Sequence, residues 1–375
     1  PDAPLIVEAG LAVVSTPDTV RVAHACVADA IRELVEPSCM INAHLSLAAS
    51  TDEALRRSHH LLQAGERDQA RDEALAAIGT AANRTERAAL LDVAAAADPE
   101  NDPRLVVEAA EALIDAGRCD RGIQLVRDLG AGDDPDLERR RLTAVARGAW
   151  SNDLPDKQAA LDALERTDPY EHPTEAVQLR SILARITGRI EWDPATALDH
   201  ARAGLAISER TGASPHVANS AMATALLVGG QDHWREHLEI AIEQARADGD
   251  VRTELIASDT RFIGELVFGD LDQCLLLAEE ALERAGHLQV GFMTDQFRKN
   301  VLLARMILGD APRANATEAA SLLSRSLRWR TRDHLSVVAA TGFSDSGDDL
   351  RAQHALEAAS AAHSTDATSR AMHFM

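Results

Sequence analysis

Apolar residues recur along most of this chain with the period of an α-helix. Between Leu271 and Ala285 they occupy offsets 0, 3, 4, 7, 10, 11 and 14, which places them all on one helix face. Another apolar-periodic segment runs from Val251 to Phe268, and Gly269-Asp270 between the two segments is a turn signal. The pattern predicts a hairpin of two antiparallel helices.

The same unit recurs along the chain. Its turn positions follow one another at spacings of 35, 36, 42, 39, 40 and 38 residues, at Gly117, Asn152, Gly188, Gly230, Gly269, Gly309 and Gly347. An earlier hairpin turns at Gly65 and is followed by helical sequence near Thr85 to Ala97. Such regular spacing is typical of arrays whose units bury their apolar faces only by stacking. We therefore expect an all-α fold, an α-solenoid of at least seven antiparallel helix hairpins.

A column of small residues supports this expectation. Five residues before the last five turn glycines stand Leu183, Ala225, Gly264, Ala304 and Gly342, and four of the five are small, as two closely approaching helices require. This arrangement resembles the tetratricopeptide repeat, although the period here is closer to 40 than to 34 and the consensus Trp and Tyr are mostly absent. The resemblance implies a right-handed superhelix whose first helices line a concave groove.

The first fifty residues have a different pattern. Two β-prone runs, Ala9 to Val14 and Val20 to Val22, flank turn-rich sequence and predict a short hairpin. Helical sequence follows from Ala25 to Leu34, and after a break at Pro37 another helix runs to Ala49. This order resembles the end of the winged-helix module in large ATP-binding, LuxR-type (MalT-like) bacterial transcriptional regulators. In those regulators an ATPase domain, a winged helix, a tetratricopeptide array and a DNA-binding helix-turn-helix follow one another.

The resemblance implies two domains. Residues 1–50 are expected to form a winged-helix-like remnant, and residues 51–375 a tetratricopeptide-like array that is truncated at its C-terminus. The chain starts at Pro1 as if cut from a longer protein, so flanking domains would lie outside it.

Composition and charge exclude several fold classes and classes of binding partner. Aromatic residues are only 3% of the chain, which favours a core of closely packed helices over a β-sandwich. With 38 basic and 60 acidic side chains the net charge is −22, which opposes binding to nucleic acid through non-specific electrostatics. No run of eighteen apolar residues is present, so no membrane span is expected. Four scattered cysteines indicate reduced thiols in a cytoplasmic protein.

Catalytic motifs are scarce. The sequence contains no G-x-x-x-x-G-K-[ST], no G-x-S-x-G and no G-x-G-x-x-G pattern. His233-Trp234-Arg235-Glu236-His237 matches the inverted zincin pattern H-x-x-E-H, but a helical array lacks the sheet-bound cleft and third ligand of that class. We therefore predict no enzyme activity, no cofactor and no metal site.

A stripe of residues on the first helices is the candidate binding surface. It occupies the positions eleven, eight and four residues before the last five turn glycines, and its four arginines and one glutamate give a charge of +3. The expected binding residues are Arg180, Asn219, Arg261, Arg298 and Arg305, with Met222, Val301 and Phe343 beside them for an apolar portion of the ligand. The alternative is a solvated helix face with no role in recognition.

Two functions remain open at this point. The resemblance implies a non-enzymatic sensor or scaffold segment of a LuxR-type regulator, which binds a protein, a peptide or a small acidic effector in its groove. The alternative is a stand-alone tetratricopeptide adaptor that binds peptide tails. In the first case DNA binding would belong to a C-terminal domain outside this chain. Neither a membrane nor a nucleic acid is an expected partner of this segment, and a homo-oligomer is left open.

Overall fold

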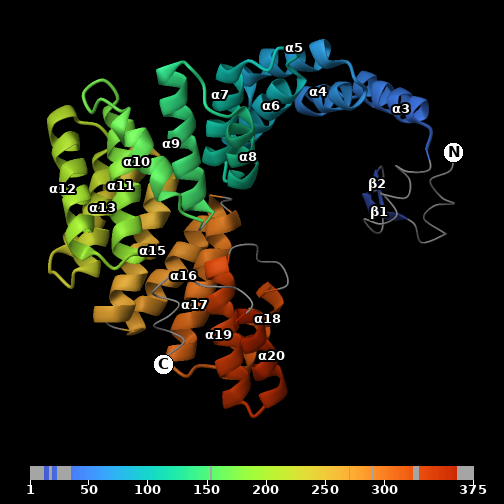
Figure 1. Cartoon of the computed structure of the whole chain (residues 1–375). Coiled ribbons are helices and arrows are strands. Elements are labelled where there is room, and N and C mark those ends of the chain that lie inside the picture. The colour runs from blue at the N-terminus through green and yellow to red at the C-terminus, as the bar shows by residue number, and fades with distance from the viewer. Residues whose placement is uncertain are drawn as a thin grey trace. The chain divides into compact units, whose positions relative to one another are not determined.

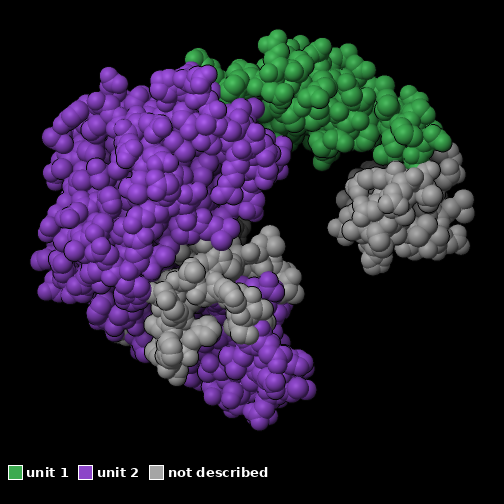
Figure 2. Space-filling model, in the orientation of Figure 1, with its two compact units in different colours: residues 1–105 green, residues 106–375 purple. Residues whose placement is uncertain are grey.

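A computed structural model of the chain describes residues 12–16, 19–22, 35–152, 154–269, 271–288, 291–323 and 329–360. It divides into two compact units, residues 1–105 and residues 106–375, which are coloured separately in Figure 2.

Unit 1 begins with the predicted hairpin. Strand β1 (Ala12–Thr16) pairs with β2 (Thr19–Val22) in antiparallel register, with Val13 opposite Arg21 and Val14 opposite Val20. The expected hairpin is thus confirmed, whereas the helix expected between Ala25 and Leu34 lies outside the described residues. Pro37 is the first residue of the next helix rather than a break before it, because proline is well accommodated in a first helical turn.

The helices of unit 1 pack in sequence order around a small core. Ala74, Leu90 and Ala94 are buried there, with Leu55, Leu62 and Leu105 packed against them. The elements are α3 (Pro37–Ser50), α4 (Ala54–Gln63), α5 (Arg67–Ala77), the short 3-10 helix η1 (Ile78–Thr80), α6 (Arg84–Ala97) and the start of α7 (Pro103–Asp115).

Unit 2 continues as a row of paired helices (Figure 1). After α7 these are α8 (Cys119–Leu129), α9 (Pro135–Ser151), α10 (Lys157–Glu165), α11 (Pro173–Arg189), α12 (Pro194–Thr211), α13 (Pro215–Val228), α14 (Trp234–Asp248), α15 (Val251–Phe268), α16 (Leu271–His287), α17 (Gly291–Ile307), α18 (Pro312–Leu323), α19 (Trp329–Asp345) and α20 (Asp349–Ser360).

The packing of unit 2 is that of a solenoid. From α8 onward each helix packs against the next one along the chain, and the first helices α9, α11, α13, α15, α17 and α19 also pack against one another in a row. The predicted α-solenoid of antiparallel helix hairpins is therefore confirmed. No helix among the described residues is both long enough and apolar enough to cross a membrane.

Most of the predicted turns are confirmed, and one is wrong. Gly65, Gly117, Gly230, Gly309 and Gly347 all have positive φ angles, between 61° and 86°, where their helix hairpins reverse. Gly188, in contrast, lies inside α11, where an added Cβ would stand 3.3 Å from the Cβ of Ala197. Gly188 therefore permits close helix packing, and the chain reverses later, near Trp192, which has a φ of 56°.

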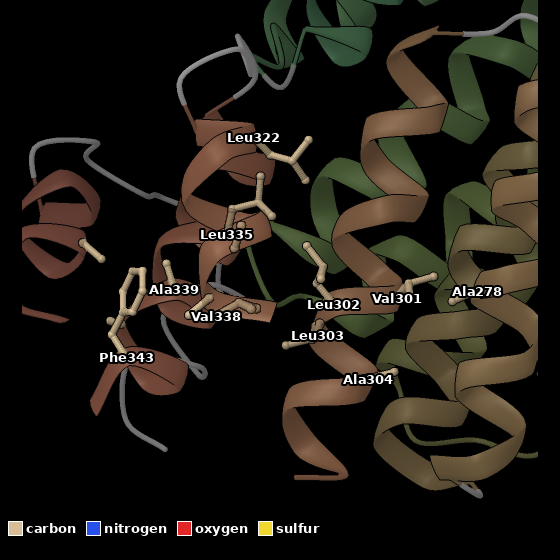
Figure 3. Close-up of a cluster of buried hydrophobic side chains, with 14 of the residues drawn as sticks. Ala278, Val301, Leu302, Leu303, Ala304, Leu322, Leu335, Val338, Ala339 and Phe343 are labelled. Atoms are coloured by element: carbon tan, nitrogen blue, oxygen red, sulfur yellow. The ribbon is translucent and has the colours of Figure 1, made fainter. Parts of the chain in front are cut away.

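Two glycines of the small-residue column lie where a first and a second helix approach closely, as predicted. A Cβ on Gly264 of α15 would stand 2.5 Å from the Trp234 ring of α14, and a Cβ on Gly342 of α19 would collide with the backbone carbonyl of Pro312. In Figure 3 Ala304 lies in the same core as Ala278, Val301 and Leu302. Small side chains here let first and second helices pack without displacing backbone.

A capping carboxylate joins two hairpins of unit 2. Asp250, the N-cap of α15, accepts hydrogen bonds from the Thr253 amide at 3.1 Å and from the Thr253 hydroxyl at 2.8 Å, and it contacts His216 Nε2 of α13 at 3.1 Å. Burial raises the pKa of Asp250, but the hydrogen bonds from His216 and Thr253 outweigh burial and hold this pKa well below its ordinary range.

We expect Asp250 to make stability pH-dependent in acid. Because its folded pKa is depressed, its contribution is complete above the unfolded pKa of about 3.9 and is lost as the pH falls through the folded value. The melting temperature of wild type should therefore exceed that of Asp250→Asn at pH 6, and the gap should narrow toward pH 3. Asp295→Asn, which changes an exposed carboxylate on α17, controls for the lost charge. A gap that is constant from pH 6 to pH 3 would contradict the expectation.

Candidate functional site

The stripe expected to line a groove is mainly a packing face. Nine of its fifteen positions are buried, among them Met222 and Phe343, which were expected to contact a ligand and instead belong to the core. The reason is angular. The column of small residues, which faces the second helices, comes three residues after the middle position of the stripe. Three residues turn a helix by about 300°, so the two positions are only about 60° apart around the helix axis. The stripe therefore largely faces the second helices rather than open solvent.

Three of the expected binding residues lie apart from one another. Arg180 on α11 is half-buried, and its Nη1 contacts His200 Nδ1 of α12 at 3.1 Å. Burial lowers the pKa of both Arg180 and His200, and the arginine charge lowers the His200 pKa further. Asn219 on α13 is buried, and its Oδ1 lies 2.8 Å from His237 Nδ1 of α14. Arg261 on α15 lies beside Glu239 of α14, with 3.8 Å between Nη2 and Oε1.

The other two expected residues share a pocket. Arg298 and Arg305, two turns apart on α17, line a pocket of about 370 Å³ between α16, α17 and α18. Val301 and Leu302 of α17 line it as well, together with Leu282 of α16. The pocket thus combines apolar side chains with two guanidinium groups, which are the donors that pair with carboxylates through parallel hydrogen bonds.

Three glutamates change the charge of this pocket. Glu279 and Glu283 come from α16 and Glu318 comes from α18. Arg305 Nη2 donates to Glu279 Oε1 at 2.8 Å, while Arg298 Nε is 3.6 Å from Glu318 Oε1, and all four of these side chains are more than a third exposed. Two arginines and three glutamates give the pocket a formal charge of −1. The positive charge of Arg298 and Arg305 is therefore offset by glutamates from the neighbouring helices.

The glutamates were not predicted as site residues, although the sequence carries a signal for them. Glu279 and Glu283 occupy the polar face of the helix whose apolar period is the clearest in the chain. The stripe was defined on first helices alone, so it omitted the second helices that pack on both sides of it.

The histidines of the H-x-x-E-H pattern do not share a helix face. His233 precedes α14 with a φ of 72°, and its Nδ1 contacts Glu236 at 3.0 Å. His237 is turned toward Asn219, and burial lowers its pKa. Within the described ranges no group of three or more metal-ligating side chains comes together.

The chain is similar to solved structures at low sequence identity. No family model matches the chain, and no curated protein matches its sequence. One similar solved structure is a Signal Transduction ATPase with Numerous Domains (STAND) protein with a tetratricopeptide repeat sensor from Pyrococcus horikoshii. It is 15% identical with a TM-score of 0.45, over 94% of this chain and 56% of that one. Another is the TPR domain of P58(IPK), 14% identical with a TM-score of 0.26, over 88% of this chain and 96% of that one.

This chain spans little more than half of the STAND structure. The fold of the chain follows from its own helix pairing. The described helices of unit 2 form an α-solenoid of helix hairpins.

Proposed function

We propose that this chain is a non-enzymatic sensor or scaffold segment of a LuxR-type transcriptional regulator, and that it binds a protein or peptide partner through its helical array. The observation that carries the proposal is the pocket between α16, α17 and α18, which Arg298 and Arg305 line together with the apolar side chains of Val301 and Leu302. Its polar groups come from three consecutive helices, so a ligand bound there would contact two neighbouring hairpins at once.

The pocket favours a partner of mixed charge. A purely acidic effector would have to compete with Glu279 and Glu318 for the two arginines and would be repelled by Glu283. A ligand with both charges could pair its carboxylates with the arginines and its basic groups with the glutamates that are released, at a cost of only about 0–1 kcal/mol for each exposed ion pair that is broken. Among the expected partners, a peptide segment with both acidic and basic side chains therefore fits better than a small dicarboxylate.

The regulator is preferred over a stand-alone adaptor because of the N-terminal hairpin. An adaptor that needs only its repeats has no use for β1 and β2 ahead of α3. In the proposed arrangement residues 1–50 are the winged-helix-like remnant and residues 51–375 are the repeat array. A nucleotide-binding motif encoded upstream and a helix-turn-helix encoded downstream in the same reading frame would support this arrangement, and the absence of both would favour the adaptor.

Binding to the pocket can be tested with peptides. We expect peptides that alternate Glu and Lys to bind the chain more tightly than all-Glu peptides of equal length. If Arg298 pairs with a ligand carboxylate away from water, Arg298→Ala should cost roughly 2–5 kcal/mol of binding, against about 0–1 for a solvated charge. Fluorescence anisotropy of labelled peptides measures both effects, with Arg305→Ala as a second pocket variant.

The matched control for this experiment is Arg313→Ala, which removes an exposed arginine of α18 that does not line the pocket. Unchanged affinity in Arg298→Ala and Arg305→Ala would show that both arginines belong to a solvated helix face with no role in binding.

A further inference from the structure

Two histidine rings join α3 and α4 of unit 1. His44 on α3 and His60 on α4 are both half-buried, and their Nδ1 atoms are 3.0 Å apart. The ring centroids are 5.3 Å apart, and the ring planes are tilted by 36°. A hydrogen bond between these two nitrogens needs one of them to carry the hydrogen and the other to present its lone pair. At least one of the two rings must therefore be neutral.

The contact between the rings tolerates one added proton but not two. When one ring is protonated, its Nδ1–H can still donate to the lone pair of the neutral ring. When both rings are protonated, both Nδ1 atoms are donors, and two positive charges face each other at hydrogen-bond distance. The two rings thus titrate as a coupled pair, and the contact is lost when the pair takes up its second proton.

The surroundings of the pair oppose that second proton. Burial lowers the pKa of His60, and the charges of His44, His59 and Arg56 lower it further. All three of these neighbours are basic, and α3 itself contains no acidic residue. Among the described residues no carboxylate acts on His60 in the opposite direction. The pair is therefore held below full protonation at neutral pH.

The carboxylates on either side of α4 are already paired with arginines. Glu53, the N-cap of α4, lies 2.9 Å from Arg56 Nε, and Glu73 of α5 accepts from Arg57 Nε at 2.8 Å. The helix α6 also packs against α4, but it adds no charge that acts on His60. In the described part of unit 1, a doubly protonated pair would thus gain no compensating partner.

The helix α3 is held by few other contacts. Ala48 is its one buried residue, whereas Ile41 is 41% exposed and Leu47 is 48% exposed. Within the described ranges, α3 packs against α4 and against no other helix to a comparable extent. The free energy that keeps α3 in place is therefore small, and the contact between His44 and His60 makes a substantial part of it.

We propose that His44 and His60 form a pH-sensitive latch, which holds α3 against α4 at neutral pH and releases α3 in mild acid. In chain order α3 follows the β1–β2 hairpin and precedes the other described helices, so its release would loosen the connection between the two. The latch uses no residue of the pocket on α17 and does not depend on the function proposed above.

The direction of the pH effect follows from the lowered pKa of His60. Its contribution to the attachment of α3 is complete above the unfolded pKa of about 6.5, and it is lost as the pH falls through the folded value. We therefore expect α3 to open more often at pH 5.5 than at pH 7.5.

Hydrogen exchange of the whole 375-residue chain tests the latch. Amide protection factors, which are corrected for the intrinsic effect of pH on exchange, should fall severalfold in α3 between pH 7.5 and pH 5.5. Those of α6, which lies in the core of unit 1, should stay constant. Equal protection of α3 at both pH values, or an equal loss in α6, would overturn the proposal.

Variants separate the charge of the pair from other effects of acid. His44→Lys places a permanent positive charge beside His60, so α3 should already show its acid level of protection at pH 7.5. Asn42→Lys is the matched control, because it adds the same charge to an exposed position of α3 about 200° around the helix axis, and it should behave like wild type. Wild-type protection of α3 in His44→Lys at pH 7.5 would contradict the latch.

His60→Gln removes the titrating ring from α4. The fall in α3 protection between pH 7.5 and pH 5.5 should disappear in this variant, and a fall as large as in wild type would overturn the assignment to His60. Should His60→Gln loosen α3 at both pH values, the comparison of His44→Lys with Asn42→Lys still decides the matter.

Discussion

Replacing Phe262 with alanine is expected to reduce the free energy of unfolding of unit 2 by about 3–5 kcal/mol. Phe262 on α15 is 1% exposed, is one of the largest fully buried side chains and packs in the cluster that spans α15 to α20. Its removal leaves a cavity between helices that pack only against their neighbours, so surrounding side chains can close it only in part.

Phe268→Ala is the matched control for this prediction. Phe268 lies on the same helix but is 55% exposed, so its truncation should change stability by no more than about 0.5 kcal/mol. Urea unfolding followed by far-ultraviolet circular dichroism gives the two losses, and hydrogen exchange of the α15 and α16 amides locates them. Equal losses in the two variants would show that the α15 core is not packed as described.

Gly342→Ala has the second largest expected effect on stability, a loss of about 1–3 kcal/mol from overpacking. An added Cβ would stand 3.0 Å from the Cβ of Ala316 and would collide with the Pro312 carbonyl, which is backbone and cannot turn aside. The helices α18 and α19 would therefore have to move apart.

Gly286→Ala tests the same chemical change without the collision. Gly286 lies in α16, where nothing stands within 4 Å of an added Cβ, so alanine should stabilise the helix by about 0.4–1 kcal/mol. Melting temperatures of the two variants should thus shift in opposite directions. A Gly342→Ala protein as stable as wild type would contradict the close approach of α18 and α19.

The sequence predicts those parts of the fold that depend on local pattern. The apolar period from Val251 to Phe268 predicts α15 residue for residue, because a helix that buries one face must repeat its apolar positions. Turn glycines such as Gly230 and Gly309 are informative because the left-handed backbone is costly for other residues. Gly188 misled the prediction because glycine also serves close helix packing, and spacing alone does not separate the two uses.

The candidate site was harder to predict, because it depends on which helices meet. Arg298 and Arg305 were identified from their spacing along one helix, but their partners Glu318 and Glu279 come from the two helices that flank it.

Arg252 at the start of α15 donates a hydrogen bond to the hydroxyl of Ser151 at the end of α9, and this contact should affect how the array responds to force and to loss of its ends. In a simple row of hairpins each unit is held only by its neighbours, so the row can unravel one hairpin at a time. A contact from α9 to α15 encloses the hairpins between them in a closed loop of interactions. Unfolding any one of these hairpins then requires the contact between α9 and α15 to break or to bear the applied force. This stretch of the array should therefore behave mechanically as one block.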